Sequence, residues 1–154
     1  MIYFSPANAG GTVYKWMDVF MDECRKLGCH IDYLATHLYS SGNAKHDMDV
    51  LKKAYDTYGL KIWLTEFGVH NEDDEDEIIK YIEDFLPRLE NADFIAKYSW
   101  FYSRFPENHN HDGSWWLDSN NNLFDPDGYE LTKVGKAYDQ PWHLEKYKPK
   151  YIFG

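Results

Sequence analysis

One carboxylate lies at a position where α/β proteins place reactive groups. Glu66 follows the apolar run 61–64 and is itself followed by Phe67 and Gly68. The run predicts a buried parallel strand, and the C-terminal ends of such strands carry the chemistry of barrel enzymes. A carboxylate there can attack an electrophilic carbon or exchange a proton. Cleavage of a glycosidic bond would need two carboxyl groups, and no partner for Glu66 is evident elsewhere in the chain.

Polar and aromatic side chains accompany the ends of two other predicted strands. His37 and Tyr39 are two residues apart, and so are Trp100 and Tyr102. Residues at this spacing share one face of a strand. We expect His37 and Tyr39 to line a cleft beside Glu66. Trp100 is a candidate for stacking on a sugar and Tyr102 for binding substrate. The alternative is that Trp100, Tyr98 and Tyr102, which share a face, form an aromatic stack inside the core.

Strand alternation also assigns faces around Glu66. It predicts that Glu66 shares a face with Leu64 and Ile62, while Trp63 and Thr65 lie on the other face. Trp63 is then expected to pack beneath the helices.

The elements that must position these residues alternate along the chain. Hydrophobic periodicity and turn residues predict strands over 2–4, 31–39, 60–65 and 95–102, and helices over 13–27, 45–58, 71–89 and 133–138. Pro87 predicts a kink or an early end of the third helix. Strands alternating with helices favour a parallel sheet with right-handed crossovers. Eight such units need about 250 residues, so this α/β chain is expected to form a partial barrel with a loop-rich C-terminal tail.

Composition limits the partners of the chain. The 154 residues are 44% hydrophobic and 27% charged, which fits a single domain over 1–154. A net charge of −10 argues against nucleic acid or an anionic membrane surface and favours a neutral ligand. No apolar run approaches the roughly 20 residues of a membrane span. Residues 1–6 lack the pattern of a signal peptide, so an extracellular location would require an upstream signal, and the compartment stays open.

The remaining motifs favour structural roles. Cys24 and Cys29 could form a disulfide across a helix–strand turn or remain free thiols. The acidic run 72–77 is expected to complement a helix N-terminus. The sequence His109-Asn-His111-Asp112 is expected to be a polar loop, and a calcium loop at 118–129 is rejected because Leu123 replaces its glycine. We expect neither a metal nor a cofactor.

Five segments taken together resemble glycoside hydrolase family 128, a group of β-1,3-glucanases with an Asl-like glycosyl hydrolase catalytic core. The resemblance covers residues 3–138, and its segments are SPANAGG, CHIDYLATHLYS, KIWLTEFGV, AKYSWFYS and LTKVGKAY. It implies a (β/α)8 TIM barrel of which this chain supplies strands five to eight. It also implies a retaining mechanism and a β-1,3-glucan poly- or oligosaccharide as the partner.

The resemblance assigns roles to single residues. Glu66 matches the catalytic nucleophile, His37 and Tyr39 match residues that line the cleft, and Trp100 matches the tryptophan of the sugar platform. The acid/base glutamate of the family lies in an Asn-Glu-Pro motif that this sequence lacks. We therefore predict the C-terminal part of a retaining β-1,3-glucanase, and whether it is an active enzyme by itself is left open.

Two alternatives follow from that missing half. The chain would otherwise be a non-catalytic half barrel that binds carbohydrate. Its exposed barrel edges would also accept either the missing N-terminal half or a second copy of the chain, giving a homodimer.

Overall fold

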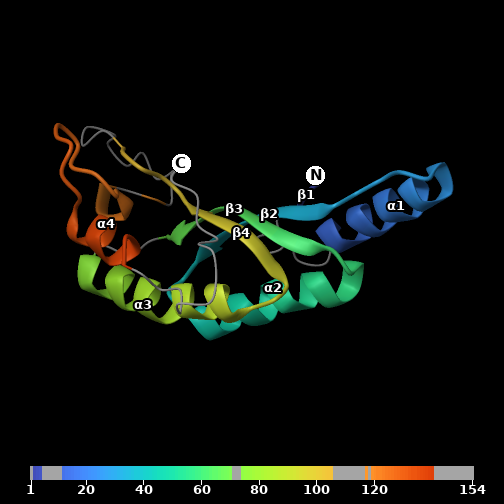
Figure 1. Cartoon of the computed structure of the whole chain (residues 1–154), viewed down its shortest axis with the longest axis horizontal. Helices are drawn as coiled ribbons and strands as arrows, with labels where there is room; N and C mark the ends of the chain where they lie inside the picture. The colour runs from blue at the N-terminus through green and yellow to red at the C-terminus, as the bar shows by residue number, and fades with distance from the viewer. Residues whose placement is uncertain (1, 5–11, 71–73, 106–116, 118, 141–154) are drawn as a thin grey trace.

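The computed structural model describes residues 2–4, 12–70, 74–105, 117 and 119–140, and strands alternate with helices along them (Figure 1). The elements are β1 (Ile2–Phe4), α1 (Thr12–Leu27), β2 (Tyr33–Ser40), α2 (Ala44–Tyr58), β3 (Lys61–Val69), α3 (Glu75–Asn91), β4 (Ile95–Trp100), the 3-10 helix η1 (Ser119–Asn121) and α4 (Lys133–Tyr138). The four strands form one sheet in the order β1-β2-β3-β4, and every pair is parallel. The predicted α/β alternation and parallel sheet are confirmed. That this sheet is half of an eight-stranded barrel, and that 1–154 is one domain, stay predictions.

A bulge in β3 decides which side chains face which way. Thr36 of β2 lies opposite Leu64, but the next residue, His37, lies opposite Glu66, so Thr65 has no partner in the ladder. An extra residue in one strand reverses the alternation beyond it. Ile62 and Leu64 therefore face the core, whereas Glu66 faces the other side. The prediction that Glu66 shares a face with Leu64 and Ile62 is wrong for this reason.

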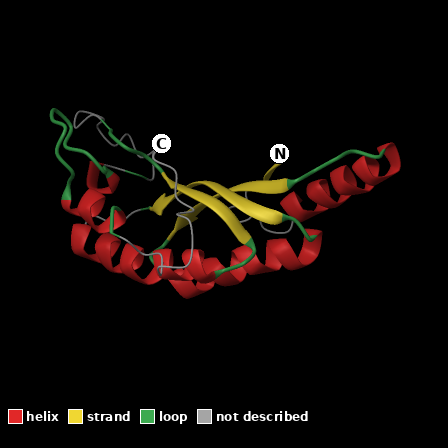
Figure 2. Ribbon diagram, viewed as in Figure 1, coloured by secondary structure: helices red, strands yellow, loops and turns green. Residues whose placement is uncertain are grey.

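The core lies between the sheet and two helices. Figure 2 shows α2 and α3 lying along one face of the sheet. The residues that fill this layer are fully or almost fully buried: Leu34, Leu38, Leu51, Ala54, Ile62, Leu64, Phe67, Ile78, Ile82, Phe85, Leu86, Leu89, Ile95, Tyr98 and Trp100. Phe67 is central, because its ring meets the rings of Phe85, Tyr98 and Trp100 edge to face at 5.1–6.0 Å. Such contacts add to the stabilisation from burial.

Local signals set the bounds of the two core helices. Asn43 accepts a hydrogen bond from the backbone N–H of His46 at the start of α2, and Gly59 ends that helix in the left-handed conformation with φ 68°. Asp74 caps α3, and Glu75, Asp76 and Glu77 occupy its first turn, as predicted for the described part of the acidic run. The early end expected at Pro87 is wrong, because α3 continues to Asn91.

A buried polar contact joins α2 to α3. The hydroxyl of Tyr81 donates to Oδ2 of Asp47 at 3.0 Å, and both residues are at most 4% exposed. Burial raises the pKa of the Asp47 carboxyl, against the opposing effect of its hydrogen bonds with Ser40 and Tyr81. The charged form is therefore disfavoured in the folded chain.

We expect Asp47→Asn to change how stability depends on pH. The folded chain binds the Asp47 proton more tightly than the unfolded chain, so this contribution to stability is complete below about pH 3.8 and is lost as the pH rises through the folded pKa. The Tm of the variant minus that of the parent should increase from pH 4 to pH 7 in thermal melts.

Asp49→Asn is the matched control. Its hydrogen bond with Lys45 lowers the pKa of the exposed Asp49 carboxyl, so the same Tm difference should stay level or decrease over this range. A flat profile for Asp47→Asn would contradict the assignment.

The segment after β4 is fastened by a close backbone contact. A Cβ on Gly135 of α4 would lie 2.0 Å from the carbonyl oxygen of Leu123, which is a severe steric clash. Thr132 caps this helix by accepting from the N–H of Gly135 at 2.9 Å. Glycine is therefore required where α4 meets the 121–124 segment.

Gly135→Ala should lower the free energy of unfolding by about 1–3 kcal/mol, the usual cost of forced overpacking. Gly128→Ala is the control, since the nearest atom to its added Cβ is 3.4 Å away. Chemical denaturation of both variants measures the difference. Equal stabilities would show that the contact relaxes without cost.

Candidate functional site

The candidate site lies on the face of the sheet opposite α2 and α3. Its strand residues are the half-buried Tyr33, His37, Tyr39, Trp63 and Glu66. Tyr33 and Trp63 stack with their ring centroids 5.2 Å apart, which places Trp63 on this face and not beneath the helices as predicted. Glu66 is the only acidic residue within the four described strands.

Two side chains from β2 hold one oxygen of Glu66. Nδ1 of His37 lies 3.0 Å from Oε2, and the hydroxyl of Tyr39 donates a short hydrogen bond to the same atom. The pairing of His37 with Glu66 across the bulge brings these groups together. No residue in the described ranges donates to the other oxygen, Oε1. The described residues thus hold the carboxylate through Oε2, and His37 and Tyr39 lie beside Glu66; that they line a cleft stays a prediction.

His37 is held in its neutral form. Burial lowers the pKa of His37 below its ordinary value of 6.5, and the negative charge of Glu66 acts in the opposite direction. A neutral imidazole carries one N–H, and the short distance to Glu66 assigns that proton to Nδ1. His37 is therefore a hydrogen-bond donor that orients Glu66 and adds no full positive charge beside it.

Trp100, the residue expected to stack on a sugar, is buried in the core. Trp100 is only 3% exposed, its Nε1 donates to the carbonyl of Asn121 at 2.8 Å, and its ring packs against Phe67 in the core. The prediction that Trp100 stacks on a sugar at an open mouth is therefore wrong; Trp100 and Tyr98 lie in the core, as the alternative had it, whereas Tyr102 is half-buried outside it. The alternation of β4 is the reason, because Trp100 shares the face of Tyr98, which pairs with Leu64 on the side that the helices cover; the register shift places Phe67 opposite Trp100 there.

Phe101 is the aromatic residue on the open face that the sequence interpretation missed. It follows β4 directly, its N–H donates to the carbonyl of Phe67 at 2.8 Å, and its half-buried ring meets Tyr39 edge-on at 6.2 Å. The signal was present, since adjacent residues on a strand face opposite ways. A buried Trp100 places Phe101 beside the site.

Tyr102 lies one residue further along. Its ring stacks on Phe105 at 4.6 Å and meets Phe101 edge-on at 4.8 Å, and its hydroxyl donates to the carbonyl of Leu117. Tyr102 thus touches the site through Phe101. Its role in binding substrate stays a prediction.

The strand ends around Glu66 are locked by backbone contacts. A Cβ on Gly68 would approach the carbonyl oxygen of Phe101 to 3.0 Å, so glycine permits the close approach of β3 to the chain after β4. The buried side-chain amide of Asn121 both donates to the carbonyl of Val69 and accepts from its N–H. The carboxylate therefore rests on a rigid strand end, as a reactive group requires.

The other predicted sites have these outcomes. Cys24 and Cys29 are free thiols, one buried and one exposed, so the disulfide is not formed; the hydrogen bond between the two thiols raises the pKa of Cys24. The described residues contain no group of three or more His, Cys, Asp or Glu arranged to hold a metal ion. The sequence 109–112 lies outside them. None of the helices that they form combines the length and apolar character needed to cross a bilayer.

Comparison with known proteins shows the class of this fold and site. The chain belongs to the glycosyl hydrolase catalytic core family, whose model matches residues 2–138. Alkali-sensitive linkage protein 1 of Schizosaccharomyces pombe is 34% identical to it over 91 residues, which are 56% of this chain and 16% of that protein.

Two solved structures identify the branch of the family. A GH128 subgroup II endo-β-1,3-glucanase of Sorangium cellulosum is 27% identical, with a TM-score of 0.70 over 89% of this chain and 53% of its own. A GH128 subgroup III curdlan-specific exo-β-1,3-glucanase of Blastomyces gilchristii, in complex with glucose, is 28% identical, with a TM-score of 0.64 over 88% and 51%. The resemblance to family 128 is confirmed, and the chain spans about half the length of these relatives.

The contact between His37 and Glu66 can be tested by proton titration. Burial places the His37 pKa below 6.5 in the parent, and Glu66→Gln should lower it further because the favourable charge is removed. NMR titration of the imidazole signals measures both values. Asp22→Asn, which changes an exposed carboxylate paired with Arg25 on α1, should leave the value unchanged. A rise on Glu66→Gln would contradict the geometry.

Proposed function

We propose that this chain provides the nucleophile and part of the sugar cleft of a retaining hydrolase of β-1,3-glucans. The observation that carries the proposal is the state of Glu66, whose Oε2 is held by His37 and Tyr39 while no described residue donates to Oε1. Membership of the glycosyl hydrolase core family supports it. The two relatives above, an endo- and an exo-β-1,3-glucanase, supply the substrate class.

The geometry suits attack on an anomeric carbon. Oε1 of Glu66 forms a bond to that carbon as the bond to the leaving oxygen breaks, and the glycosyl ester is later hydrolysed by water, which returns the carboxylate. The donors on Oε2 fix the orientation of the carboxylate. Phe101 and Tyr39 offer aromatic faces and edges beside it for the sugar ring.

The general acid must come from outside the four strands. The leaving oxygen needs a proton, and a retaining enzyme places its two carboxyl groups about 5 Å apart. The neutral His37 cannot supply this proton at neutral pH, since burial lowers its pKa. General acid assistance is worth about 10² to 10⁴ in rate. Natural laminari-oligosaccharides should accordingly be cleaved slowly by the chain alone.

An activated substrate tests the nucleophile separately from the acid. A 2,4-dinitrophenyl 2-deoxy-2-fluoro-β-laminaribioside has a leaving group that departs without a proton, and its fluorine slows hydrolysis of the ester. We expect intact-mass spectrometry to show one added glycosyl group on the parent, and peptide mapping to locate it on Glu66. Glu66→Gln should remain unlabelled.

Glu23→Gln is the matched control, because it removes an exposed carboxylate on α1 and should be labelled like the parent. Labelling of Glu66→Gln at the parental rate would contradict the proposal. Binding of laminarihexaose in calorimetry, without any labelling, would instead identify a non-catalytic binding half barrel.

A further inference from the structure

Asn121 is a polar residue of the C-terminal segment that is buried beside the candidate site. It is the last residue of η1 and is 1% exposed. The asparagine-rich run 120–122 had no role in the sequence interpretation except in the rejected calcium loop. A buried amide needs partners for both its N–H groups and its carbonyl oxygen, since an unpaired polar group costs free energy. The positions of these partners show what the side chain does.

The Asn121 amide completes the hydrogen bonding of β3 where β4 has ended. The ladder between the two strands has its last pair at Phe67 and Trp100. Two residues further along β3, the N–H of Val69 donates to Oδ1 of Asn121 at 3.1 Å. In return, Nδ2 of Asn121 donates to the carbonyl of Val69 at 3.0 Å. One side chain thus bonds both backbone groups of Val69, as a neighbouring strand would do.

The backbone of Asn121 holds the end of β4. Its carbonyl accepts from Nε1 of Trp100 at 2.8 Å, and the next residue, Phe101, carries the aromatic ring of the candidate site. The side chain of Asn121 holds β3 three residues after Glu66. A single buried residue therefore connects the strand end that carries the carboxylate with the strand end that carries the ring.

The amide fits closely into this position. A Cβ on Gly68 would lie 3.3 Å from Oδ1 of Asn121 and 3.0 Å from the carbonyl oxygen of Phe101. The end of β3, the Asn121 amide and the chain after β4 therefore meet with little room between them. Because packed elements of this kind transmit a displacement to one another, a shift of Asn121 must move one strand end relative to the other.

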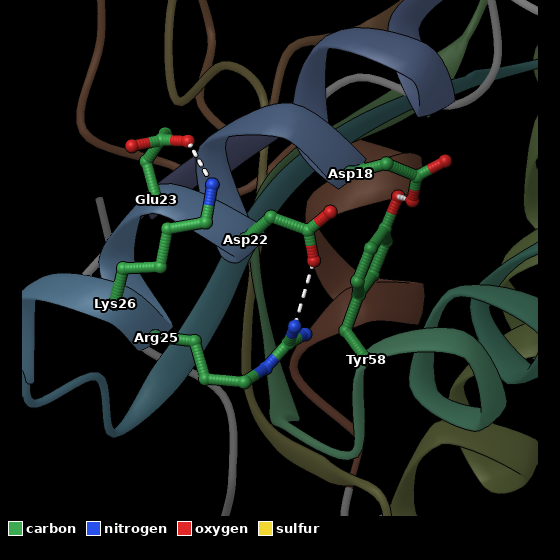
Figure 3. A network of polar contacts seen from close by, with 6 residues as sticks. All are labelled: Asp18, Asp22, Glu23, Arg25, Lys26 and Tyr58. Atoms are coloured by element: carbon green, nitrogen blue, oxygen red, sulfur yellow. Dashed lines mark hydrogen bonds and ion pairs between the residues drawn. The ribbon is translucent and has the colours of Figure 1, made fainter.

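Polar contacts of a different kind occur on α1. Figure 3 shows Asp22 paired with Arg25 and Glu23 with Lys26, and each pair is exposed and lies within one helix. Exposed pairs of this sort contribute little to stability. The Asn121 contacts are instead buried and join residues that are 52 and 21 positions apart in the chain. They therefore fix the tertiary geometry of the strand ends.

We propose that Asn121 is a positioning residue for the Glu66 carboxylate, because it fixes the end of β3 against the end of β4 that carries Phe101. It acts through Val69 and Trp100 and not on the sugar itself. A reactive group and the groups that orient its substrate must keep their positions to within about 0.5 Å. The catalytic consequence rests on the proposed function, whereas the position of Glu66 can be measured without any sugar.

Asn122 offers a matched control for this kind of contact. Its Oδ1 accepts from the N–H of Phe105 at 2.7 Å, its Nδ2 donates to the carbonyl of Phe105 at 3.0 Å, and it is also 1% exposed. The two asparagines differ in what they hold, since Asn121 holds β3 and Asn122 holds the segment after β4. Equal substitutions should therefore cost similar stability, and only those at Asn121 should displace Glu66.

The first measurement needs no sugar. Burial lowers the pKa of His37, and the negative charge of Glu66 opposes this effect. Asn121→Ala should loosen the contact between the two residues, so NMR titration should show the His37 pKa lowered further, towards its value in Glu66→Gln. Asn122→Ala should leave the His37 pKa at the parental value. A merely structural role of Asn121 would lower the Tm of both variants without changing His37.

The second measurement uses the activated laminaribioside. Asn121→Asp keeps the shape of the side chain, but the introduced carboxyl can make both hydrogen bonds to Val69 only while it is protonated, which burial favours. Its labelling rate should match that of the parent at pH 4. At pH 8 the rate should be about 10- to 100-fold below that of the parent, as expected for a displaced reactive group. Asn122→Asp should show no such trend.

Near-UV circular dichroism measures the folded fraction at each pH, and the rates are normalised to it. The acid form of Asn121→Asp retains both hydrogen bonds, so it provides a folded variant even if Asn121→Ala does not fold. The proposal is overturned by a His37 pKa that is unchanged in Asn121→Ala or lowered equally in Asn122→Ala. A labelling rate of Asn121→Asp relative to the parent that is independent of pH overturns it as well. A parent that is not labelled contradicts the proposed function instead, and the His37 titration still tests the position of Glu66.

Discussion

The site depends on one irregularity, the extra residue at Thr65. Without it, strict alternation would direct Glu66 into the layer between sheet and helices, where an ionised carboxylate would need a partner to offset its desolvation. With it, Glu66 stands opposite His37 on the open face. The bulged residue is itself satisfied, because the hydroxyl of Thr65 donates to the carbonyl of Thr36 at 3.1 Å. A local departure from regular pairing thus places the Glu66 carboxylate on the open face while its strand remains part of the core.

The same irregularity explains which parts of the molecule were predictable from sequence. Helix bounds followed from periodicity and turn residues, and the helix predicted at 133–138 is α4. Strand positions followed from apolar runs between turn residues. Faces around the site did not follow, because composition carries no mark of a bulge. Trp63 was therefore predicted in the core although it lies on the open face, and Trp100 was predicted on the open face although it lies in the core. Phe101 was overlooked.

Rings were the least predictable side chains for a related reason. Tryptophan and tyrosine suit both a core and a sugar surface, so residue type alone does not choose between them. The hydrogen-bond partner of each ring decides here whether the ring lies in the core or on the open face. Asn121 accepts from the indole of Trp100 and so permits its burial, while Tyr39 stays on the open face because Glu66 accepts from its hydroxyl. The helix at Pro87 illustrates the same limit, since burial of Phe85, Leu86 and Leu89 in the core offsets the missing N–H.

The two faces of the sheet differ in how far they are buried. The core beneath β3 is buried, and Glu66, its two donors and Phe101 are held in place by contacts among the described residues. The open face is lined by half-buried aromatic residues such as Tyr33 and Trp63, which lose water contact only when another layer or a ligand covers them. Closing the sheet would exclude water from Glu66 and strengthen each electrostatic contact there. A general acid brought by the same closure would then meet the carboxylate in a dry site, which would link catalysis to assembly of the fold.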